Sequence, residues 1–242
     1  MQCVSDQSKA FMKFLLTNDD GIEAPGLAAF RAALSQFGEV LVVAPDSALS
    51  GCSHQVTAHK DLTLVERGTG QFALDGTPAD CVRVALTHLQ ADIDWVCSGI
   101  NHGGNLGVDV FLSGTVAAAR ESVLLGKPAI AISQYRRMRD YDRWEMSSQW
   151  CGPLLDSLLA RPIEPGQYWN VNLPDPDVSV EQPEAVECPL DTNPLPVRYE
   201  VTDGRLRYRG SYQQRVHHPE HDIAVCFGGR IAVTPLNVRH GR

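Results

Sequence analysis

Short apolar runs alternate with amphipathic segments over the first two thirds of the chain. Residues 12–17 (MKFLLT) form a compact apolar run that ends in Asn-Asp-Asp-Gly, which is typical of a buried strand followed by a tight turn. Apolar residues then recur at helical spacing from Pro25 to Phe37, where Pro25 suits the first turn and Gly38 suits the stop. Residues 40–44 (VLVVA) form a second apolar run. This order predicts a right-handed crossover and a parallel sheet.

The same alternation continues to about residue 175. Further strands are predicted at 62–65, 72–74, 95–98, 129–133 and 169–173, and further helices at 78–89, 115–125 and 143–159. Thr77 suits the cap of a helix that begins with Pro78, and a loop rich in Gly and Asn is expected over residues 99–107. The pattern predicts an α/β fold: a Rossmann-like, doubly wound, mostly parallel sheet that forms a core over residues 1–175.

The character of the chain changes after Pro174. Proline becomes dense and helical periodicity disappears. Residues 197–201 and 206–208, joined through Asp203-Gly204, predict a hairpin, and residues 231–234 predict a late strand. Residues 176–242 are therefore predicted to be an irregular, partly β C-terminal extension.

The acidic balance of the chain restricts its partners. The formal net charge of the 242 residues is −8, and the pI is near 5.4. Proteins that bind a nucleic-acid duplex usually present a basic patch, whereas the basic blocks here are no longer than Arg136-Arg137. Long nucleic acid is therefore not expected as a partner. An acidic protein binds phosphate through a local device, such as a metal ion or oriented backbone N–H groups.

Cysteine use and apolar run length indicate a cytoplasmic protein. The seven cysteines are odd in number and scattered, without a C-x-x-C pair, so reduced thiols are expected rather than a disulfide framework or a zinc site. Residues 1–13 lack the apolar run of a signal peptide. Because no apolar run approaches the ~20 residues that a membrane-spanning helix needs, no membrane association is expected.

Two adjacent carboxylates, Asp19 and Asp20, follow the first predicted strand. In an open parallel sheet, ligands bind beyond the carboxyl ends of the strands, near the switch in strand order. Neighbouring carboxylates repel each other unless a cation neutralises them, and Mg²⁺ prefers oxygen ligands. The alternative interpretation is a simple turn, because Asn-Asp-Asp-Gly is also ordinary turn chemistry.

Two further segments at the same predicted edge offer phosphate ligands. The loop over residues 98–107 combines glycines, which allow close backbone approach, with Asn101 and Asn105, whose amides bind a metal or phosphate oxygens. Ser113-Gly114-Thr115 immediately precedes a predicted helix, whose N-terminus presents free N–H groups and a positive dipole end. A surface loop and simple helix capping remain the alternatives.

Weaker candidates lie nearby. Ser50 is a possible hydroxyl ligand, but its neighbours Ala48 and Cys52 exclude a G-x-S-x-G nucleophile elbow. His102 is a candidate proton donor to a leaving group. His217, His218 and His221 are expected in a solvated loop. Dinucleotide (G-x-G-x-x-G) and P-loop fingerprints are absent from the sequence.

Taken together, these segments resemble the SurE family of stationary-phase survival nucleotidases. The matching segments are TNDDG at 17–21 with APG at 24–26, VVAPD at 42–46 with SG at 50–51, GTPADCV at 76–82, SGIN at 98–101 with Gly103, NLG at 105–107, SGTVAAA at 113–119, GKPA at 126–129, NVNLP at 170–174 and VTPL at 233–236. The ordered set is specific and spans nearly the whole chain.

The resemblance implies a 5′-nucleotidase, a phosphoric monoester hydrolase that acts on nucleoside 5′- and 3′-monophosphates, and in some members on short polyphosphate. It implies one divalent cation per subunit, Mg²⁺ or Mn²⁺, held by Asp19, Asp20, Ser50 and Asn101, with Asp19 and Asp20 catalytic. It implies phosphate binding by Asn105, Ser113, Gly114 and Thr115. It also implies homodimers or homotetramers built by exchange of the C-terminal extension.

The sequence leaves the nucleophile open. Either Asp19 or Asp20 orients an attacking water or takes its proton, or Asp19 forms an aspartyl-phosphate. A haloacid-dehalogenase-type phosphatase is one rival, although that chemistry needs D-x-D after the first strand and the aspartates here are adjacent. A nucleotide-binding module without enzymatic activity is the other.

Overall fold

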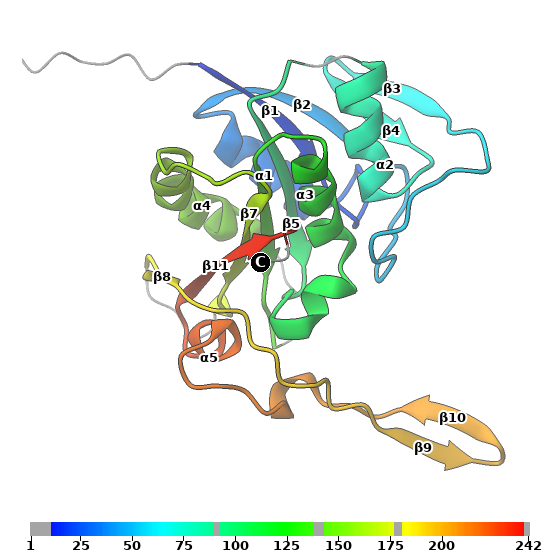
Figure 1. The fold of residues 1–242 in the computed structure, drawn as a ribbon, viewed down its shortest axis with the longest axis vertical. Coiled ribbons are helices and arrows are strands. Elements are labelled where there is room, and N and C mark those ends of the chain that lie inside the picture. Colours follow the sequence, from blue (N-terminus) through cyan, green and yellow to red (C-terminus); the bar gives the residue numbers. More distant parts are fainter. Residues whose placement is uncertain (1–10, 90–91, 138–142, 177–180, 240–242) are drawn as a thin grey trace, which may run out of the picture.

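A nine-stranded sheet forms the centre of the computed structural model, which describes residues 11–89, 92–137, 143–176 and 181–239 (Figure 1). In spatial order the strands are β3 (Leu64–Gly68), β4 (Gln71–Leu74), β2 (Gly38–Pro45), β1 (Met12–Thr17), β5 (Trp95–His102), β6 (Ala129–Gln134), β7 (Gln167–Leu173), β11 (Ile231–Asn237) and β8 (Ala185–Glu187). The strands from β4 to β7 are mutually parallel, whereas β3 and β11 run antiparallel to β4 and β7. The predicted mostly parallel α/β sheet is confirmed, and its strand order switches direction between β1 and β5.

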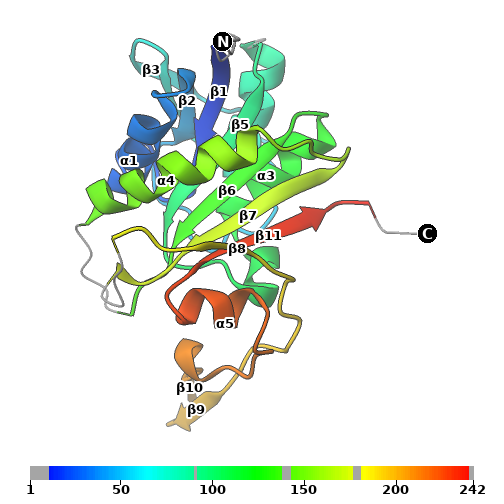
Figure 2. The same ribbon diagram turned by 90° about the vertical axis from the view of Figure 1, so that its left-hand side faces the viewer.

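Helices cover both faces of the sheet. Helices α1 (Pro25–Leu34) and α4 (Trp144–Leu159) pack together on one face (Figure 2), and α2 (Pro78–Arg83) and α3 (Gly114–Leu124) pack together on the other. The alternation of side chains along β1 explains both layers. Phe14 and Leu16 join the cluster under α1 and α4, whereas Leu15 joins the cluster under α2 and α3.

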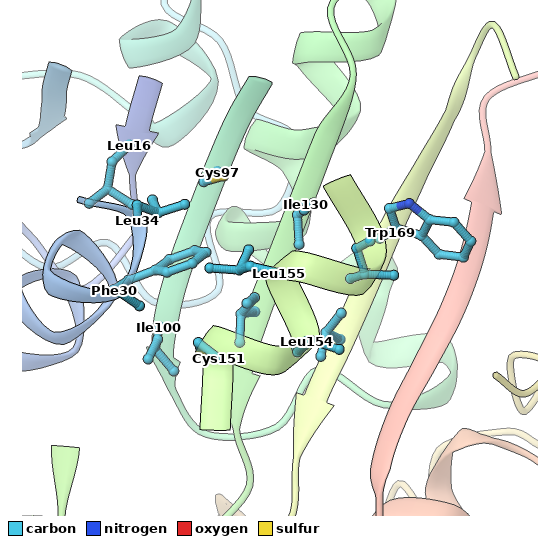
Figure 3. Packing of buried hydrophobic residues seen from close by; sticks show 14 of the residues in the cluster. Leu16, Phe30, Leu34, Cys97, Ile100, Ile130, Cys151, Leu154, Leu155 and Trp169 are labelled. Atoms are coloured by element: carbon cyan, nitrogen blue, oxygen red, sulfur yellow. The ribbon is translucent and has the colours of Figure 1, made fainter. Parts of the chain in front are cut away.

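The core under α1 and α4 is dense and apolar. Figure 3 shows Phe30 of α1 and Leu155 of α4 meeting above the strands, with Ile130 of β6 beside them. All three side chains are fully buried. This packing fixes the strands whose carboxyl ends carry the polar residues discussed below.

Several predicted elements differ from the structure in extent, and two of these differences have a clear physical cause. The loop expected from residue 99 begins only after His102, because β5 continues past an irregularity at Ser98 and pairs Asn101 with Ser133 of β6. Ile100 is fully buried, so packing of its side chain outweighs the loop preference of the neighbouring glycine and asparagine. The helix expected over residues 78–89 is α-helical only to Arg83 and continues as a π-helical turn (Val84–His88).

The chain after residue 175 contributes two strands to the central sheet and also forms a separate hairpin. Strands β8 and β11 belong to the central sheet, and the short helix α5 (Asp222–Phe227) precedes β11. The predicted hairpin is confirmed as β9 (Tyr199–Thr202) and β10 (Arg205–Tyr208), which extend away from the body of the molecule (Figure 1). Asp203 and Gly204 form its turn with positive φ angles of 52° and 73°. The division into units at residue 175 stays a prediction.

Helix α5 and strand β8 were missed by the sequence patterns. Helix α5 has six residues and β8 has three, so neither is long enough to show a period. Six cysteines are described, and all are free thiols. Within the described residues, no helix is both long and apolar enough to cross a membrane. The expectation about a signal peptide falls largely on residues 1–10, which lie outside the described part of the chain.

Candidate functional site

A tight turn after β1 presents the two adjacent carboxylates at the carboxyl edge of the sheet. The Asn18 side chain donates to the Gly21 carbonyl at 2.9 Å and accepts from the Gly21 N–H at 3.2 Å. Gly21 has a φ of 98°, which an L side chain rarely adopts. The turn chemistry seen in the sequence is therefore real, and it serves to orient Asp19 and Asp20 beside the switch in strand order.

Asp19 is buried against the N-terminus of α3. Its side chain accepts a hydrogen bond from the Thr115 hydroxyl at 2.5 Å, and the residue is only 5% exposed. Burial raises the pKa of the Asp19 carboxyl to about 6; the Thr115 hydrogen bond opposes this shift and the nearby Asp20 charge adds to it. Asp19 is thus an anion held with little water at the positive end of a helix.

Gly114 makes this close approach possible. A Cβ on Gly114 would lie 2.9 Å from the Asp19 Cβ and 2.7 Å from the Cys52 sulfur, closer than real Cβ atoms come. Ser113 caps the helix, because its hydroxyl accepts from the Val116 N–H at 3.1 Å. The capping interpretation is confirmed, because Ser113 orders the helix end that faces Asp19, and phosphate binding at this end stays a prediction.

The segment that carries Ser50 is tied to the same place from both sides. The Leu49 N–H donates to the Asp19 carbonyl at 2.7 Å. Ser53 donates its hydroxyl to the Phe111 carbonyl at 2.7 Å, two residues before Ser113. Ser50 itself is exposed at the rim between these anchors.

Two buried acids, Asp80 and Glu121, hold the part of the chain that follows Ser50 between β2 and β3. Asp80 of α2 accepts from the Thr57 N–H and hydroxyl at 2.9 and 2.7 Å. Glu121 of α3 contacts His54 at 2.8 Å and Arg83 at 2.6 Å. Burial would raise the pKa of the Glu121 carboxyl, but the hydrogen bonds from His54 and Arg83 outweigh it and hold the pKa below its ordinary value. The Ser50 segment is therefore fixed to α2 and α3.

The extension of β5 brings a third segment to the carboxylates. The His102 N–H donates to the Asp20 carboxylate at 2.8 Å, which places the adjacent Asn101 at the same edge. The Asn101 side-chain nitrogen donates to the Gly103 carbonyl at 2.8 Å, so its amide oxygen is the atom left for a ligand. Asp19, Asp20, Ser50 and Asn101 offer a donor set of oxygen atoms, the kind that Mg²⁺ or Mn²⁺ prefers, and their joint binding of one cation stays a prediction.

The donor set contains only two carboxylates. Over the described ranges, no group of three or more His, Cys, Asp or Glu side chains is arranged to hold a metal ion. In the same ranges neither Asp19 nor Asp20 forms an ion pair with Lys or Arg. The residues fit a hard divalent cation with retained waters rather than a zinc site.

Asn105 lies in a hydrogen-bond network with Asn170 and Asn172, two residues that were not predicted to belong to the site. Its N–H donates to Asn172 at 2.7 Å, and its carbonyl accepts from the Asn170 and Asn172 amides at 3.0 Å each. Its own amide donates to the Ser133 hydroxyl at 2.8 Å. A usable signal was present: asparagines at alternate positions in the buried strand β7 point to one side and need polar partners.

The histidines play smaller parts. His102 is exposed, contacts Arg136 through its Nδ1 atom and lies beside the Trp144 ring, with ring centroids 6.0 Å apart. Partial burial and the Arg136 charge lower the pKa of His102, and the nearby Asp20 carboxylate opposes this shift; its role as proton donor stays a prediction. His217 and His218 are exposed as expected, whereas His221 is partly buried near Asp191, 3.9 Å away.

A separate hollow of about 440 Å³ lies at the opposite edge of the sheet. It is lined by residues 123–124, 126–128, 163–167 and 238–239, which include the segments preceding β6 and β7. None of the residues predicted for metal or phosphate binding borders it. Ligands of parallel sheets bind at the carboxyl edge, so the candidate site is the one around Asp19.

Comparison with known proteins identifies close relatives. The family model of the survival protein SurE matches residues 14–190. The chain is 46% identical over 227 residues to a protein of Nostoc sp. that is provisionally named as a 5′-nucleotidase, with 94% of this chain and 100% of that protein covered. It is 41% identical over 241 residues to the 5′-nucleotidase SurE of Myxococcus xanthus, with 95% and 90% covered. The crystal structure of the SurE protein from Aquifex aeolicus aligns with a TM-score of 0.83 at 33% identity and covers 95% of this chain and 94% of that chain.

Proposed function

The chain belongs to the SurE family, and from that premise we propose that it is a metal-dependent 5′-nucleotidase that hydrolyses nucleoside 5′- and 3′-monophosphates to nucleoside and phosphate. The relatives named above as 5′-nucleotidases support the reaction. Family membership also favours this reaction over a dehalogenase-type phosphatase or a binding module without activity. Short polyphosphate is proposed as a further substrate.

One observation carries the metal dependence: Asp19 is buried beside Asp20 without a cationic side chain on either carboxylate in the described ranges. Burying an unpaired carboxylate costs free energy, which the pKa of about 6 reflects. A divalent cation held by Asp19, Asp20, Ser50 and Asn101 removes this cost. When bound, such a cation supplies positive charge to the phosphoryl oxygens and lowers the pKa of water.

The protein's own groups hold the phosphate. The N-terminus of α3, at Ser113, Gly114 and Thr115, directs backbone N–H groups and a positive dipole toward an anion. The backbone of Asn105 is fixed by Asn170 and Asn172 and its side-chain amide by the Ser133 hydroxyl, so Asn105 meets the phosphate with little reordering. The Thr115 hydroxyl is directed at Asp19, and this contact orients the carboxylate.

The oriented carboxylate has two possible tasks. Asp19 accepts the proton of an attacking water or positions that water in line with the leaving oxygen. The alternative is direct attack by Asp19 on phosphorus, which forms an aspartyl-phosphate that water then hydrolyses. Quenching single turnovers in acid and searching for phosphate on Asp19 separates the two.

The exposed hairpin supports the proposed assembly. Tyr199, Val201, Leu206 and Tyr208 alternate with polar residues on β9 and β10, and all four are more than half exposed. An apolar face of this kind on an extended hairpin is suited to burial against a second copy. We propose a homodimer or homotetramer formed through the extension, and the free thiols support a cytoplasmic location.

Phosphate release from a panel of esters tests the function. The panel holds 5′- and 3′-AMP, the other nucleoside 5′-monophosphates, tripolyphosphate and glucose 6-phosphate, each with Mg²⁺, Mn²⁺ or EDTA. The proposal expects turnover of the nucleoside monophosphates with metal and no turnover in EDTA. Equal rates with EDTA, or no release from any nucleotide with either metal, contradict it.

A further inference from the structure

The C-terminal extension holds the loop that carries Asn105. We call residues 211–222 the clamp and residues 104–109 the Asn105 loop. The Tyr212 hydroxyl donates to the Gly104 carbonyl at 3.2 Å, immediately before Asn105. On the other side of Asn105, Arg215 donates to the Leu106 carbonyl at 3.1 Å. The clamp therefore touches the backbone on both sides of a residue proposed to bind phosphate.

Arg215 makes the most extensive of these contacts. One guanidinium nitrogen donates to Leu106, and another donates to the Asp109 carboxylate at 2.7 Å. The guanidinium carbon lies 4.2 Å from the centroid of the Tyr212 ring. The Arg215 side chain is only 4% exposed, although its Nε atom has no hydrogen-bond partner among the described residues. A flat donor with two bonds and a stacked ring fixes geometry in a way that a lysine ammonium cannot.

A second anchor closes the clamp at its other end. The buried Asp222 carboxylate accepts from the Gly107 N–H at 2.7 Å and from the Asp191 N–H at 2.9 Å. Asp191 in turn accepts from the His218 N–H at 2.6 Å, so the clamp is tied to itself as well as to the Asn105 loop. The Asn105 loop is thus held at four successive points by residues more than 100 positions later in the chain.

These contacts fix the position of the Asn105 loop more than they increase the stability of the fold. A buried ion pair such as Arg215–Asp109 gains little net stability, because desolvation offsets much of the attraction. It does fix the backbone that carries Asn105. The same loop is held on the sheet side by Asn170 and Asn172, so Asn105 lies between the sheet and the clamp.

We propose that Arg215 is a positioning residue for phosphate binding: through Leu106 and Asp109 it holds the loop that presents Asn105 to the phosphate of the substrate. The inference rests on the proposed function only in taking Asn105 as a phosphate ligand. In the described contacts Arg215 touches neither Asp19 nor Asp20 nor the Ser50 segment, so metal binding does not depend on it.

Arg215→Lys keeps the charge and removes the paired, flat geometry, and it is the principal test. KM for AMP and the inhibition constant of inorganic phosphate are each expected to rise about tenfold, with kcat within about threefold of wild type, because a ground-state contact is weakened. The affinity for Mn²⁺ is expected to be unchanged. Tyr212→Phe removes one hydroxyl and keeps the ring, so it should raise KM for AMP and the inhibition constant of phosphate by about threefold each.

Arg209→Lys on the hairpin is the matched control. Arg209 also pairs with a carboxylate, that of Glu200, but the pair is exposed and belongs to the hairpin alone. Arg209→Lys should therefore leave KM, kcat and the inhibition constant of phosphate unchanged. Wild-type constants for both Arg215→Lys and Tyr212→Phe, or a fall in kcat without a change in KM, would overturn the proposal. If Arg215→Lys does not fold, Tyr212→Phe decides the question alone.

A calorimetric titration with inorganic phosphate separates this inference from the proposed function. If the wild-type protein hydrolyses no AMP, the proposed function fails, but the clamp still predicts weaker phosphate binding by Arg215→Lys. Equal phosphate affinity of wild type and both variants, or no phosphate binding by wild type, overturns the inference whatever the activity.

Discussion

The Thr115 hydroxyl donates a hydrogen bond of 2.5 Å to the Asp19 carboxylate, across a separation of 96 residues in the chain. The contact joins the end of the first strand to the first turn of α3. It places a buried carboxylate at the positive end of a helix, where a phosphate would otherwise bind. Because like charges repel, we expect Asp19 and a substrate phosphate to share this helix end only when a cation lies between them.

Asp19→Asn should remove activity and stabilise the metal-free protein. The pKa of Asp19 is about 6 in the folded chain, against an ordinary value of 3.8. The folded state therefore holds an extra proton between these values, and the free energy of unfolding falls as pH rises through this window. At pH 7.5 wild type bears the cost of a buried, ionised Asp19 carboxylate, and the variant does not. In EDTA the variant should therefore be about 2 kcal/mol more stable than wild type.

Chemical denaturation at pH 7.5 and pH 4 measures this difference, which should shrink at the lower pH. AMP turnover with Mn²⁺ should fall at least ~100-fold. Asp94→Asn is the control, because Asp94 is exposed and precedes β5 at the opposite edge of the sheet. A metal-free Asp19→Asn protein that is less stable than wild type at pH 7.5 contradicts the electrostatic account.

Thr115→Val should shift the pH dependence of metal binding. The Thr115 hydrogen bond lowers the pKa of Asp19, so its loss raises that pKa further above the ordinary value. Because the metal must displace the proton, affinity for Mn²⁺ weakens below this pKa. The midpoint of that weakening should move up by about one pH unit in Thr115→Val, and stay in place in Thr115→Ser. Mn²⁺ titrations between pH 5 and 8 measure it; identical profiles for the two variants would count against it.

Gly114→Ala should damage the site although alanine favours helices. The new Cβ would meet Asp19 and Cys52 at less than 3.0 Å, so one of them must move. We expect a fall of at least ~10-fold in kcat/KM and a loss of about 1–2 kcal/mol in stability. Gly152→Ala in α4 is the matched control, since no atom other than those of its chain neighbours and the nearby backbone of its own helix lies within 4 Å of its Cβ position. Because Pro153 follows and its ring crowds a Cβ on the preceding helical residue, the usual gain from alanine should be offset, so stability should change by less than about 1 kcal/mol at unchanged activity. Wild-type activity in Gly114→Ala would show that the close approach is not needed.

Glu121→Gln should destabilise the protein at neutral pH and less so in acid. His54 and Arg83 hold the pKa of Glu121 below its ordinary value of 4.5. Their stabilisation is therefore present above pH 4.5 and is lost as pH falls through the folded pKa. The variant should lose about 2 kcal/mol at pH 7.5, and the deficit should narrow near pH 3.5. Urea denaturation at both pH values checks this, and a deficit independent of pH would refute the role of the charge.

The sequence revealed the site in pieces but not its internal contacts. Asp19 and Asp20 were recognisable because they follow a buried strand, and Ser113 because it precedes a helix; both signals are local. The 2.5 Å contact between Asp19 and Thr115 was not visible, since it depends on how closely Gly114 lets α3 approach the sheet. The family resemblance supplied the grouping that local patterns lack.

The C-terminal extension was the least predictable region. Helix α5 and strand β8 are too short to show a period, and the pairing of Arg215 with Asp109 spans 106 residues. In the sequence Arg215 and Asp109 look like ordinary surface residues, because burial by a distant segment leaves no local signal. The hairpin was predictable, because Asp203-Gly204 is a turn that needs no tertiary support.

Binding of Mn²⁺ to the EDTA-treated protein, followed by electron paramagnetic resonance, tests the central claim most directly. The account predicts one Mn²⁺ per chain in wild type, and at least ~100-fold weaker binding in Asp19→Asn, with Asp94→Asn like wild type. Undiminished Mn²⁺ binding by Asp19→Asn, or full hydrolysis of AMP by wild-type protein without any metal, would contradict it.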